Sequence, residues 1–544
     1  MKILDVKNLT FKYKSGKTNL FNDISFEASE GELILLCGAT ACGKTTLLKC
    51  LKPELSPYGV KSGEINFCDT PLTDVEKSVS AAQIGYVMQR PENQTVTDKV
   101  RSELAFCGEN LGLKKNIIHR QIAETAAYFG LEAILDEKTS TLSGGQRQLL
   151  NLASVMAVNP KLILLDEPTS QLDPIAAGDF IRTLYRITRE LSITVIIIEH
   201  RFEELLPLAD KVLLLENGRQ AVFDTPHNAA KILSKCSSIL PSLPSGLQLY
   251  SHFSLSNKVN PPITISESRN MLKSQFNQNV INADLKSRAI SNETAIKLKN
   301  VFFTYQKNKN DIIRNTSLTI NKGEVFSILG SNGSGKSTLL SVISGILSPY
   351  NGSVEINDKP LKKYKKNELY HELLALLPQD VQSSFLTDTV GQELDFTSNT
   401  AICDMSSFFD MHPYDLSGGQ QQLLGIKKML MNNPKIVLLD EPTKGLDGNW
   451  KDIISKVILE MRDNGITILI VTHDMELAAR CSDRCGIFFD GSISCIGTPS
   501  EIFNESIFYT TDSAKTSHGI YNGICTTEQL IELCRINGLS GDVK

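Results

Sequence analysis

Gly38-Ala39-Thr40-Ala41-Cys42-Gly43-Lys44-Thr45-Thr46 is the stretch that decides the fold, because it returns as Gly330-Ser331-Asn332-Gly333-Ser334-Gly335-Lys336-Ser337-Thr338. Both stretches match the pattern G-x-x-x-x-G-K-[S/T]. A short apolar run precedes each one, at 32–37 and 325–329, and a helical pattern follows, at 46–51 and 338–346. A strand, a glycine loop and a helix in this order are typical of a phosphate-binding loop, and two ordered copies argue against an incidental glycine turn.

The two glycine loops supply groups suited to the phosphates of ATP. Glycines let the backbone curl so that several N–H groups point at one phosphate, and the N-terminus of the following helix adds a favourable dipole. We expect Lys44 and Lys336 to reach the β- and γ-phosphates, and Thr45 and Ser337 to bind Mg²⁺. The predicted ATP-binding residues of the loops are Gly38, Gly43, Lys44, Thr45, Thr46, Gly330, Gly333, Gly335, Lys336, Ser337 and Thr338.

Further motifs recur in the same order after each loop, so the chain contains two copies of one domain. Gln89 corresponds to Gln379, an offset of 290 residues, and Ser143 corresponds to Ser417, an offset of 274. The second copy is therefore 16 residues shorter between these motifs. Because the motifs on both sides keep their spacing, we expect the difference to lie in an accessory layer rather than in the nucleotide-binding core.

Each copy alternates apolar runs of strand length with helical patterns. This alternation predicts an α/β fold with a mostly parallel sheet and the chemistry at the carboxyl ends of its strands. We predict a first domain at 1–233, a linker at 234–294, a second domain at 295–508 and a C-terminal extension at 509–544. The linker is rich in Pro, Ser and Asn and is expected to be partly ordered at most. In the extension, 526–534 has a helical pattern, with Thr526 or Thr527 as its cap.

The composition is that of an ordinary globular protein. The 544 residues include 56 basic and 61 acidic side chains, and the net charge of −5 does not favour binding to nucleic acid. No run of about 18 apolar residues occurs, so no membrane-spanning helix is expected, and the N-terminus lacks the apolar core of a signal peptide. The twelve cysteines are scattered without a C-x-x-C pair, which favours reduced cytosolic thiols over disulfides or a metal site.

Two acidic pairs follow apolar strands. Asp166 and Asp440 end strand patterns at 162–165 and 436–439, where a carboxylate can hold Mg²⁺ through water. Glu167 and Glu441 come next, and beside a γ-phosphate such a glutamate can polarise the attacking water. A buried Asp-Glu pair can also be structural, but the repeated motif order favours catalysis.

Two histidines follow the next strand of each copy. His200 comes after the apolar run 193–198 and His473 after 466–471, where each is expected to contact the γ-phosphate. A single histidine in such a place is more often structural. The repeat is the reason to prefer a functional role here.

A second phosphate cradle is predicted in each copy. Ser143-Gly144-Gly145 and Ser417-Gly418-Gly419 each precede a Gln-rich helical stretch, and a serine hydroxyl with glycine amides at a helix start suits a phosphate. This cradle lies far along the chain from the glycine loop of the same copy. Two cradles for one ATP in each domain predict that the two domains share their ATP sites face to face.

The first glycine loop departs from the second at two positions. Ala41 stands where the second copy has Gly333, and at a positive φ it costs on the order of 1 kcal/mol, whereas at a negative φ it costs nothing. Cys42, at a helix N-terminus, is expected to have a lowered pKa. We therefore expect thiol reagents to alkylate Cys42, and bound ATP to block the reaction.

Taken together, these motifs resemble the ATPase subunits of ABC transporters over 1–226 and 296–508: the phosphate loop, the glutamine, Leu-Ser-Gly-Gly-Gln, the Asp-Glu pair, the Leu-Asp loop and the histidine. The resemblance implies two tandem P-loop NTPase domains, each with a helical subdomain. It implies that Lys44 faces Ser417 and that Lys336 faces Ser143 across the two domains. It implies that Tyr13 and Tyr305 stack on adenine, unless they are merely strand-edge aromatics. It implies that Gln89 and Gln379 are catalytic residues and Mg²⁺ ligands. The remaining implied site residues are Asp173 and Asp447 of the Leu-Asp loops.

A finer resemblance is to the ATPases of energy-coupling factor (ECF) transporters, which import vitamins and metal ions. It rests on 89–96, Gln-Arg-Pro-Glu-Asn-Gln-Thr-Val, on 103–113 and on Glu199-His200-Arg201, and it is weaker after Gln379. It implies a transmembrane scaffold subunit and a small substrate-capturing membrane protein as partners, at the cytoplasmic face of the membrane. Glu92, Asn93 and Asp380 are candidate docking residues.

Two alternatives stay open. The chain is also compatible with the motor of another importer, for a sugar or a peptide. A twin ATPase that acts on ribosomes or DNA fits less well, because ribosome-acting relatives usually carry a charged helical linker and the linker here is polar. The sequence does not identify the cargo, because such an ATPase does not touch it.

Overall fold

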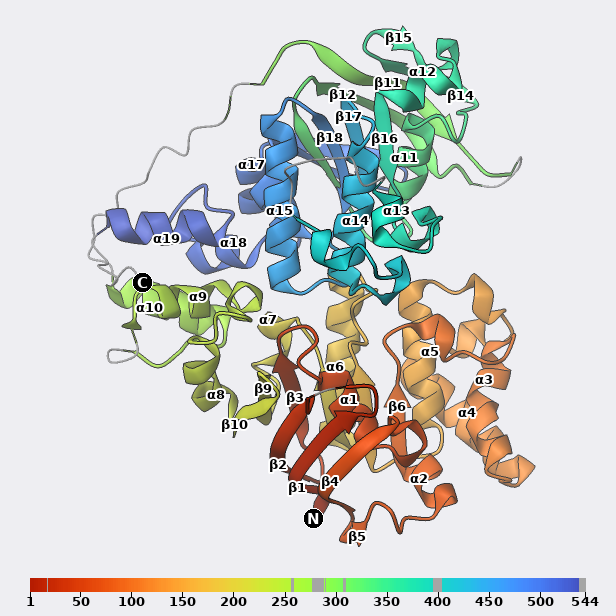
Figure 1. The fold of residues 1–544 in the computed structure, drawn as a ribbon. Coiled ribbons are helices and arrows are strands. Elements are labelled where there is room, and N and C mark those ends of the chain that lie inside the picture. The colour runs from red at the N-terminus through yellow and green to blue at the C-terminus, as the bar shows by residue number, and fades with distance from the viewer. Residues whose placement is uncertain are drawn as a thin grey trace. The chain divides into compact units, whose positions relative to one another are not determined.

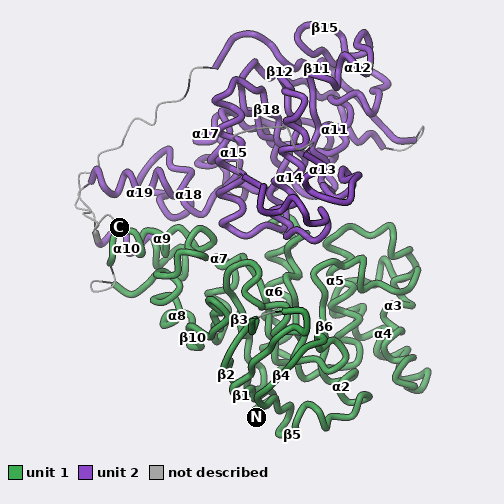
Figure 2. The backbone as a smooth tube through the Cα atoms, in the orientation of Figure 1, with its two compact units in different colours: residues 1–268 green, residues 269–544 purple. Residues whose placement is uncertain are grey.

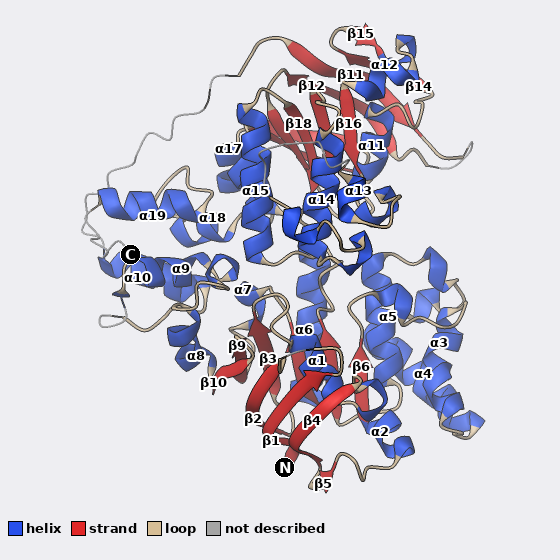
Figure 3. Cartoon of the chain, viewed as in Figure 1, coloured by secondary structure: helices blue, strands red, loops and turns tan. Residues whose placement is uncertain are grey.

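The computed structural model describes residues 1–16, 18–255, 259–275, 288, 290–306, 310–394 and 404–537. They form two compact units, unit 1 over 1–268 and unit 2 over 269–544 (Figure 2). Each unit contains a small antiparallel sheet, a larger mostly parallel sheet and covering helices (Figure 3). The predicted α/β fold of two tandem domains, each with a parallel core and a helical subdomain, is confirmed.

The larger sheet of unit 1 has the strand order β10-β9-β3-β8-β7-β6, and the smaller one has the order β2-β1-β4-β5 (Figure 1). In the larger sheet, only the edge strand β10 runs antiparallel to its neighbour. The strands are β1 (Lys2–Tyr13), β2 (Phe21–Ser29), β3 (Leu33–Gly38), β4 (Gly59–Phe67), β5 (Thr70–Pro71), β6 (Ile84–Val87), β7 (Leu162–Asp166), β8 (Thr194–Ile198), β9 (Lys211–Glu216) and β10 (Arg219–Asp224).

The helices of unit 1 cover both faces of the larger sheet. Three of them, α3, α4 and α5, pack against one another as a helical subdomain (Figure 3). The helices are α1 (Lys44–Cys50), α2 (Lys77–Gln83), α3 (Val100–Asn110), α4 (Lys115–Phe129), α5 (Gly144–Met156), α6 (Pro174–Leu191), α7 (Phe202–Leu205), α8 (Pro226–Leu233), α9 (Ser245–His252) and α10 (Ile265–Gln275), which extends past the boundary at 268.

Unit 2 repeats this plan, with sheet orders β16-β17-β18-β13-β19-β20 and β12-β11-β14-β15. Its strands are β11 (Thr294–Phe303), β12 (Ile313–Asn321), β13 (Val325–Leu329), β14 (Asn351–Ile356), β15 (Lys359–Pro360), β16 (Leu374–Leu377), β17 (Ile436–Asp440), β18 (Thr467–Thr472), β19 (Arg484–Phe489) and β20 (Ser492–Gly497). Its helices are α11 (Lys336–Ile343), α12 (Lys366–His371), α13 (Val390–Glu393), α14 (Gly418–Leu430), α15 (Gly448–Asp463), α16 (Met475–Cys481), α17 (Pro499–Glu505), α18 (Asp512–Ser517) and α19 (Thr527–Ile536).

The central strands are buried on both faces, which explains their continuous apolar sequence. In β3, Leu33 and Leu35 belong to the hydrophobic cluster on one face of the sheet, while Ile34 and Leu36 belong to the cluster on the other face. The strand then ends at Gly38, at the carboxyl edge of the sheet. The glycine loop therefore starts from a rigid support.

The structure adds detail where the sequence is less periodic. Within the predicted linker interval, the helices α9 and α10 form, and the buried Leu247 of α9 joins the core of unit 1, while 256–258, 276–287 and 289 lie outside the described residues. In the C-terminal extension, Thr526 caps α19, as expected. Throughout the described ranges, every helix is too short or too polar to cross a bilayer.

The predicted length difference between the copies falls in the helical subdomain. In unit 1, this segment contains α3 and the 15-residue helix α4. In unit 2, the four-residue helix α13 stands in the place of α3. Residues 395–403, which follow α13, lie outside the described part of the chain.

Candidate nucleotide-binding site

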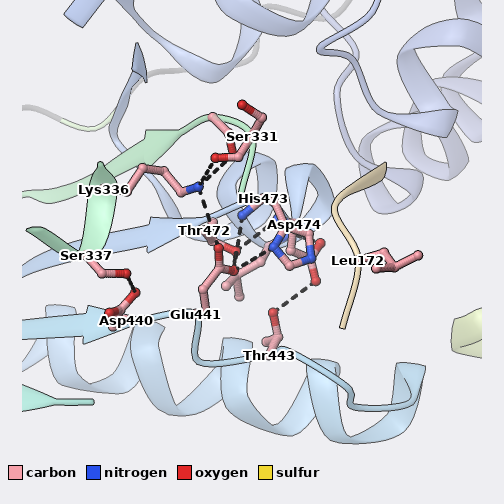
Figure 4. Close-up of polar contacts among 12 residues, drawn as sticks. Leu172, Ser331, Lys336, Ser337, Asp440, Glu441, Thr443, Thr472, His473 and Asp474 are labelled. Atoms are coloured by element: carbon pink, nitrogen blue, oxygen red, sulfur yellow. Dashed lines mark hydrogen bonds and ion pairs between the residues drawn. The ribbon is translucent and has the colours of Figure 1, made fainter. Parts of the chain in front are cut away.

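Each glycine loop connects the central strand of its sheet to a helix, with the lysine folded over the loop. Lys44 Nζ donates hydrogen bonds to the carbonyls of Gly38 and Ala39 at 2.9 and 2.8 Å. In unit 2, Lys336 Nζ donates to Gly330 and Ser331, both at 2.8 Å (Figure 4). Both ammonium groups are buried in their loops, where they concentrate positive charge beside the helix N-terminus.

The glycine that begins each helix requires a left-handed backbone. Gly43 and Gly335 cap α1 and α11 with φ of 102° and 107°. Ala41 also has a positive φ, 65°, and its counterpart Gly333 has 77°. Of the two possibilities for Ala41, the structure therefore supports the strained one, with a cost of about 1 kcal/mol.

A hydroxyl and a carboxylate lie side by side below each loop. Thr45 Oγ1 donates to Asp166 Oδ1 at 2.9 Å, and Ser337 Oγ donates to Asp440 Oδ1 at 3.0 Å. Two hard oxygen ligands beside a phosphate cradle fit Mg²⁺, which binds through one or two carboxylates together with substrate phosphates. The residues present thus suit the predicted Mg²⁺ and ATP.

The acidic side chains differ between the units in their hydrogen bonds. Tyr86 on β6 donates from Oη to the second carboxylate oxygen of Asp166 at 3.1 Å, whereas unit 2 has Leu376 at that place on β16. Burial raises the pKa of Asp166 and raises the pKa of Asp440 to about 6, with the adjacent glutamate adding to the effect. Mg²⁺ binding to Asp440 therefore also requires loss of a proton at mildly acidic pH.

In unit 1, the glutamine, glutamate and histidine predicted to be catalytic meet at one point. Gln89 Nε2 donates to Glu167 Oε2 at 2.6 Å, and His200 Nε2 lies 3.2 Å from Glu167 Oε1. Glu167 has a left-handed backbone with φ of 45° at the end of β7. Such strained backbone is common at functional sites, and here it turns the carboxylate toward Gln89 and His200.

In unit 2, the glutamate is more deeply buried and contacts its histidine and the loop lysine (Figure 4). His473 Nδ1 lies 2.9 Å from Glu441 Oε2, at ion-pair distance but without the alignment of a hydrogen bond. Lys336 Nζ lies 3.9 Å from Glu441 Oε1. Burial opposes ionisation, but His473 and Lys336 together hold the pKa of Glu441 below its usual range. Gln379, two residues after the end of β16, is exposed.

The predicted second cradle is the start of a helix in each unit. Ser143 caps α5, since its Oγ accepts the N–H of Gln146 at 3.2 Å, and Ser417 caps α14 in the same way. Of the glycines that follow, Gly144 and Gly418 are exposed, Gly145 is half-buried and Gly419 is buried. A Cβ at Gly419 would collide with the ring of Trp450, so this glycine is required by packing as well.

One further pair of predicted residues caps helices. Asp173 and Asp447 cap α6 and α15, because Oδ1 of each accepts a backbone N–H at 2.9 Å.

The two tyrosines stand beside the first turn of the helix after the loop. Tyr13 Oη lies 2.9 Å from Thr46 Oγ1, and Tyr305 Oη lies 3.2 Å from Thr338 Oγ1. Each ring packs edge-on against a phenylalanine two residues earlier. Stacking of these rings on adenine stays a prediction.

The predicted lowered pKa of Cys42 is wrong. Burial raises the pKa of the Cys42 thiol, and this effect outweighs the nearby Lys44, which lowers it. A Cβ added to Gly38 would collide with Cys42 Sγ, so the Cys42 sulfur lies against the backbone of the loop. The helix N-terminus does not compensate for this loss of solvent.

The sequence did not predict the residues whose hydrogen bonds support the site residues and the turn after the acidic pair. Tyr86 is one, and its only signal is a polar hydroxyl within an apolar strand. Glu199 is another, since its buried carboxylate accepts the N–H of Thr169 at 2.7 Å after the acidic pair. In unit 2, Asp474 accepts the Thr443 hydroxyl at 3.0 Å in an equivalent role (Figure 4).

Comparisons with known proteins agree with this geometry. The family profile described as ABC transporter matches residues 21–170 and 313–444. A protein of Bacillus cereus, provisionally named an ABC transporter ATP-binding protein, is 36% identical and covers 97% of this chain and 98% of its own. A protein of Bacillus subtilis, provisionally named the HMP/thiamine import ATP-binding protein YkoD, is 31% identical and covers 97% of each chain.

Among solved structures, an archaeal ribosome recycling factor in complex with a ribosomal stalk protein is similar in fold. The TM-score is 0.56 with 20% identity, and the match covers 87% of each chain. At this identity, the likeness concerns the fold alone.

Proposed function

The chain belongs to the family of ABC transporter ATP-binding proteins, and on this premise we propose that it drives an importer of the ECF type for a vitamin or a metal ion. It is an ATPase whose hydrolysis is coupled to transport. The observation that carries the catalytic assignment is the meeting of Gln89, Glu167 and His200. The thiamine-import name of the Bacillus subtilis relative supports a vitamin as the cargo.

In this proposal, the two units form two composite ATP sites. The loop of Lys44 works with the helix start at Ser417, and the loop of Lys336 works with Ser143, while Tyr13 and Tyr305 stack on the adenines. The support is that each unit has one complete loop with its acidic pair and one separate serine-capped helix. Mg²⁺ neutralises charge on the β- and γ-phosphates when bound.

The water that attacks the γ-phosphate is oriented by the glutamates. One carboxylate oxygen of Glu167 accepts a hydrogen bond from Gln89, and the other lies at hydrogen-bond distance from His200. These two contacts fix the direction of the carboxylate. His473 and Lys336 hold the pKa of Glu441 below its usual range and so favour its carboxylate form, which accepts hydrogen bonds and can orient a water. Both units therefore carry the groups required for hydrolysis.

Movement reaches the membrane partners through the segment after each glutamine. Glu92, Asn93 and Asp380 are exposed there. An exposed apolar residue lies at the same place in both units, Val96 at 65% and Leu386 at 84% exposure. We place the docking surface for a transmembrane scaffold subunit on these two segments, at the cytoplasmic face of the membrane.

Affinity purification of the tagged chain from membranes of its own host tests this proposal. Mass spectrometry is expected to find an integral scaffold subunit and a small substrate-capturing membrane protein, and the bound small molecule identifies the cargo. Val96→Asp with Leu386→Asp should reduce their recovery, whereas Val60→Asp, at an equally exposed valine of β4, should not. Recovery of a sugar- or peptide-binding importer, or of ribosomes, would refute the ECF assignment.

A further inference from the structure

The Leu-Ser-Gly-Gly-Gln motif, here called the signature, begins one helix in each unit, α5 or α14. A polar side chain on each of these signature helices connects the helix to the segment after the glutamine. In unit 1, Arg147 lies on α5, one turn after Ser143, and its Nη1 donates to Glu92 Oε1 at 3.0 Å. Its Nη2 also donates to the carbonyl of Ser140 at 3.5 Å. One guanidinium thus joins α5, the turn before the signature and the segment proposed to dock on the membrane partner.

Unit 2 has the same connection without charge. Gln421 occupies the place of Arg147 on α14, and its Oε1 accepts the Gln382 Nε2 donor at 3.0 Å. Its Nε2 donates to the carbonyl of Pro413, in the turn before Ser417, at 3.1 Å. Gln382 stands where unit 1 has Glu92, so a charged pair in one unit corresponds to an amide pair in the other.

A second contact lies one helical turn further along each helix. Asn151 Nδ2 donates to the carbonyl of Pro91 at 3.1 Å, and Asn151 Oδ1 accepts the Thr95 hydroxyl at 3.1 Å. In unit 2, Gly425 takes this place and lets Val381 approach so closely that a Cβ would collide with it. Because residues four apart share a helix face, the segment is held to two successive turns in both units.

We propose that Arg147 and Gln421 are positioning residues, which make each signature serine move together with the docking segment of its own unit. Only the unit 1 connection depends on charge. The side chains of Arg147 and Glu92 are 18% and 56% exposed, so salt screens this pair, whereas an amide pair carries no net charge to screen. The inference rests on the proposed function, in which Ser143 completes the ATP site at Lys336.

Equilibrium binding of a fluorescent, non-hydrolysable ATP analogue to the full chain, with Mg²⁺, tests the proposal one site at a time. Lys44→Ala leaves the site at Lys336, and Lys336→Ala leaves the site at Lys44. At low salt, Arg147→Gln should raise the Kd of the ATP analogue roughly threefold in the Lys44→Ala background. It should leave this Kd unchanged in the Lys336→Ala background. At about 0.5 M salt, the difference should disappear.

Matched variants separate positioning from a loss of folding. The reversed pair, Glu92→Arg with Arg147→Glu, should restore Kd in the Lys44→Ala background. Gln421→Ala should raise Kd in the Lys336→Ala background at low and high salt alike. Melting temperatures identify any variant that simply unfolds. If Arg147→Gln unfolds, the reversed pair still tests the role of charge.

Three outcomes distinguish the claims. A rise in Kd that follows salt and charge reversal supports the positioning role. An unchanged Kd in both backgrounds refutes it. A rise confined to the Lys336→Ala background would support the positioning contact and refute the cross-unit arrangement of the proposed function.

Discussion

Exchange of alanine and glycine in the two glycine loops provides a reciprocal test of the backbone geometry. Ala41 and Gly333 are exposed equivalents with φ of 65° and 77°. A Cβ at Gly333 would meet nothing within 4 Å, so its cost is conformational rather than steric. We expect Ala41→Gly to stabilise the nucleotide-free protein and Gly333→Ala to destabilise it.

The magnitude follows from two opposing effects. A non-glycine residue in the left-handed region costs about 1–2 kcal/mol. Glycine gives back about 0.4–1 kcal/mol of this by increasing the entropy of the unfolded chain. The midpoints of the two ranges give a net change of about 0.8 kcal/mol in each direction, which is about 0.3–0.4 M in the urea midpoint at a slope of about 2–3 kcal/mol/M.

Urea unfolding separates the two units because the single tryptophan, Trp450, lies in unit 2. Its fluorescence reports the Gly333→Ala change, and circular dichroism adds the transition of unit 1. Opposite shifts confirm the reasoning. Shifts in the same direction, or a stable Gly333→Ala variant, would refute a left-handed backbone at these positions.

Two more predictions concern ionisation. Since the folded pKa of Asp440 is raised from 3.8 to about 6, stability from this group is present at low pH and is lost as pH rises through that window. Asp440→Asn should therefore match the parent near pH 4 and be more stable by about 3 kcal/mol at pH 8 without nucleotide, and lower stability at pH 8 would contradict the assignment. Because burial raises the pKa of Cys42, iodoacetamide at pH 7 should label it more slowly than the exposed Cys495, as peptide mass spectrometry can show, and faster labelling of Cys42 would restore the original expectation.

The nucleotide-binding core was predictable because its signals are local. A buried strand, a glycine loop and a helix start lie within twenty residues, so the sequence placed β3, β7 and β8 to within about one residue. The same holds for Thr526, whose hydroxyl bonds to an amide three residues later.

Features that depend on distant packing were not predictable. The hydrogen bond of Tyr86 to Asp166 joins neighbouring strands that are eighty residues apart in sequence. The pKa of Cys42 follows from the chain that covers it, and sequence alone shows only the helix N-terminus. Arg147 and Gln421 differ as residue types, so the repeat conceals their common role until the turns before Ser143 and Ser417 are seen in space.

Hydrolysis and binding measured together on the double variant Glu167→Gln with Glu441→Gln test the central claim most directly. The account predicts that release of phosphate from ATP stops while Mg²⁺-dependent ATP binding persists, because the glutamates orient water and the loops of Lys44 and Lys336 hold the phosphates. Each single variant should keep appreciable activity if the two sites act independently. Continued turnover in the double variant would contradict the catalytic assignment.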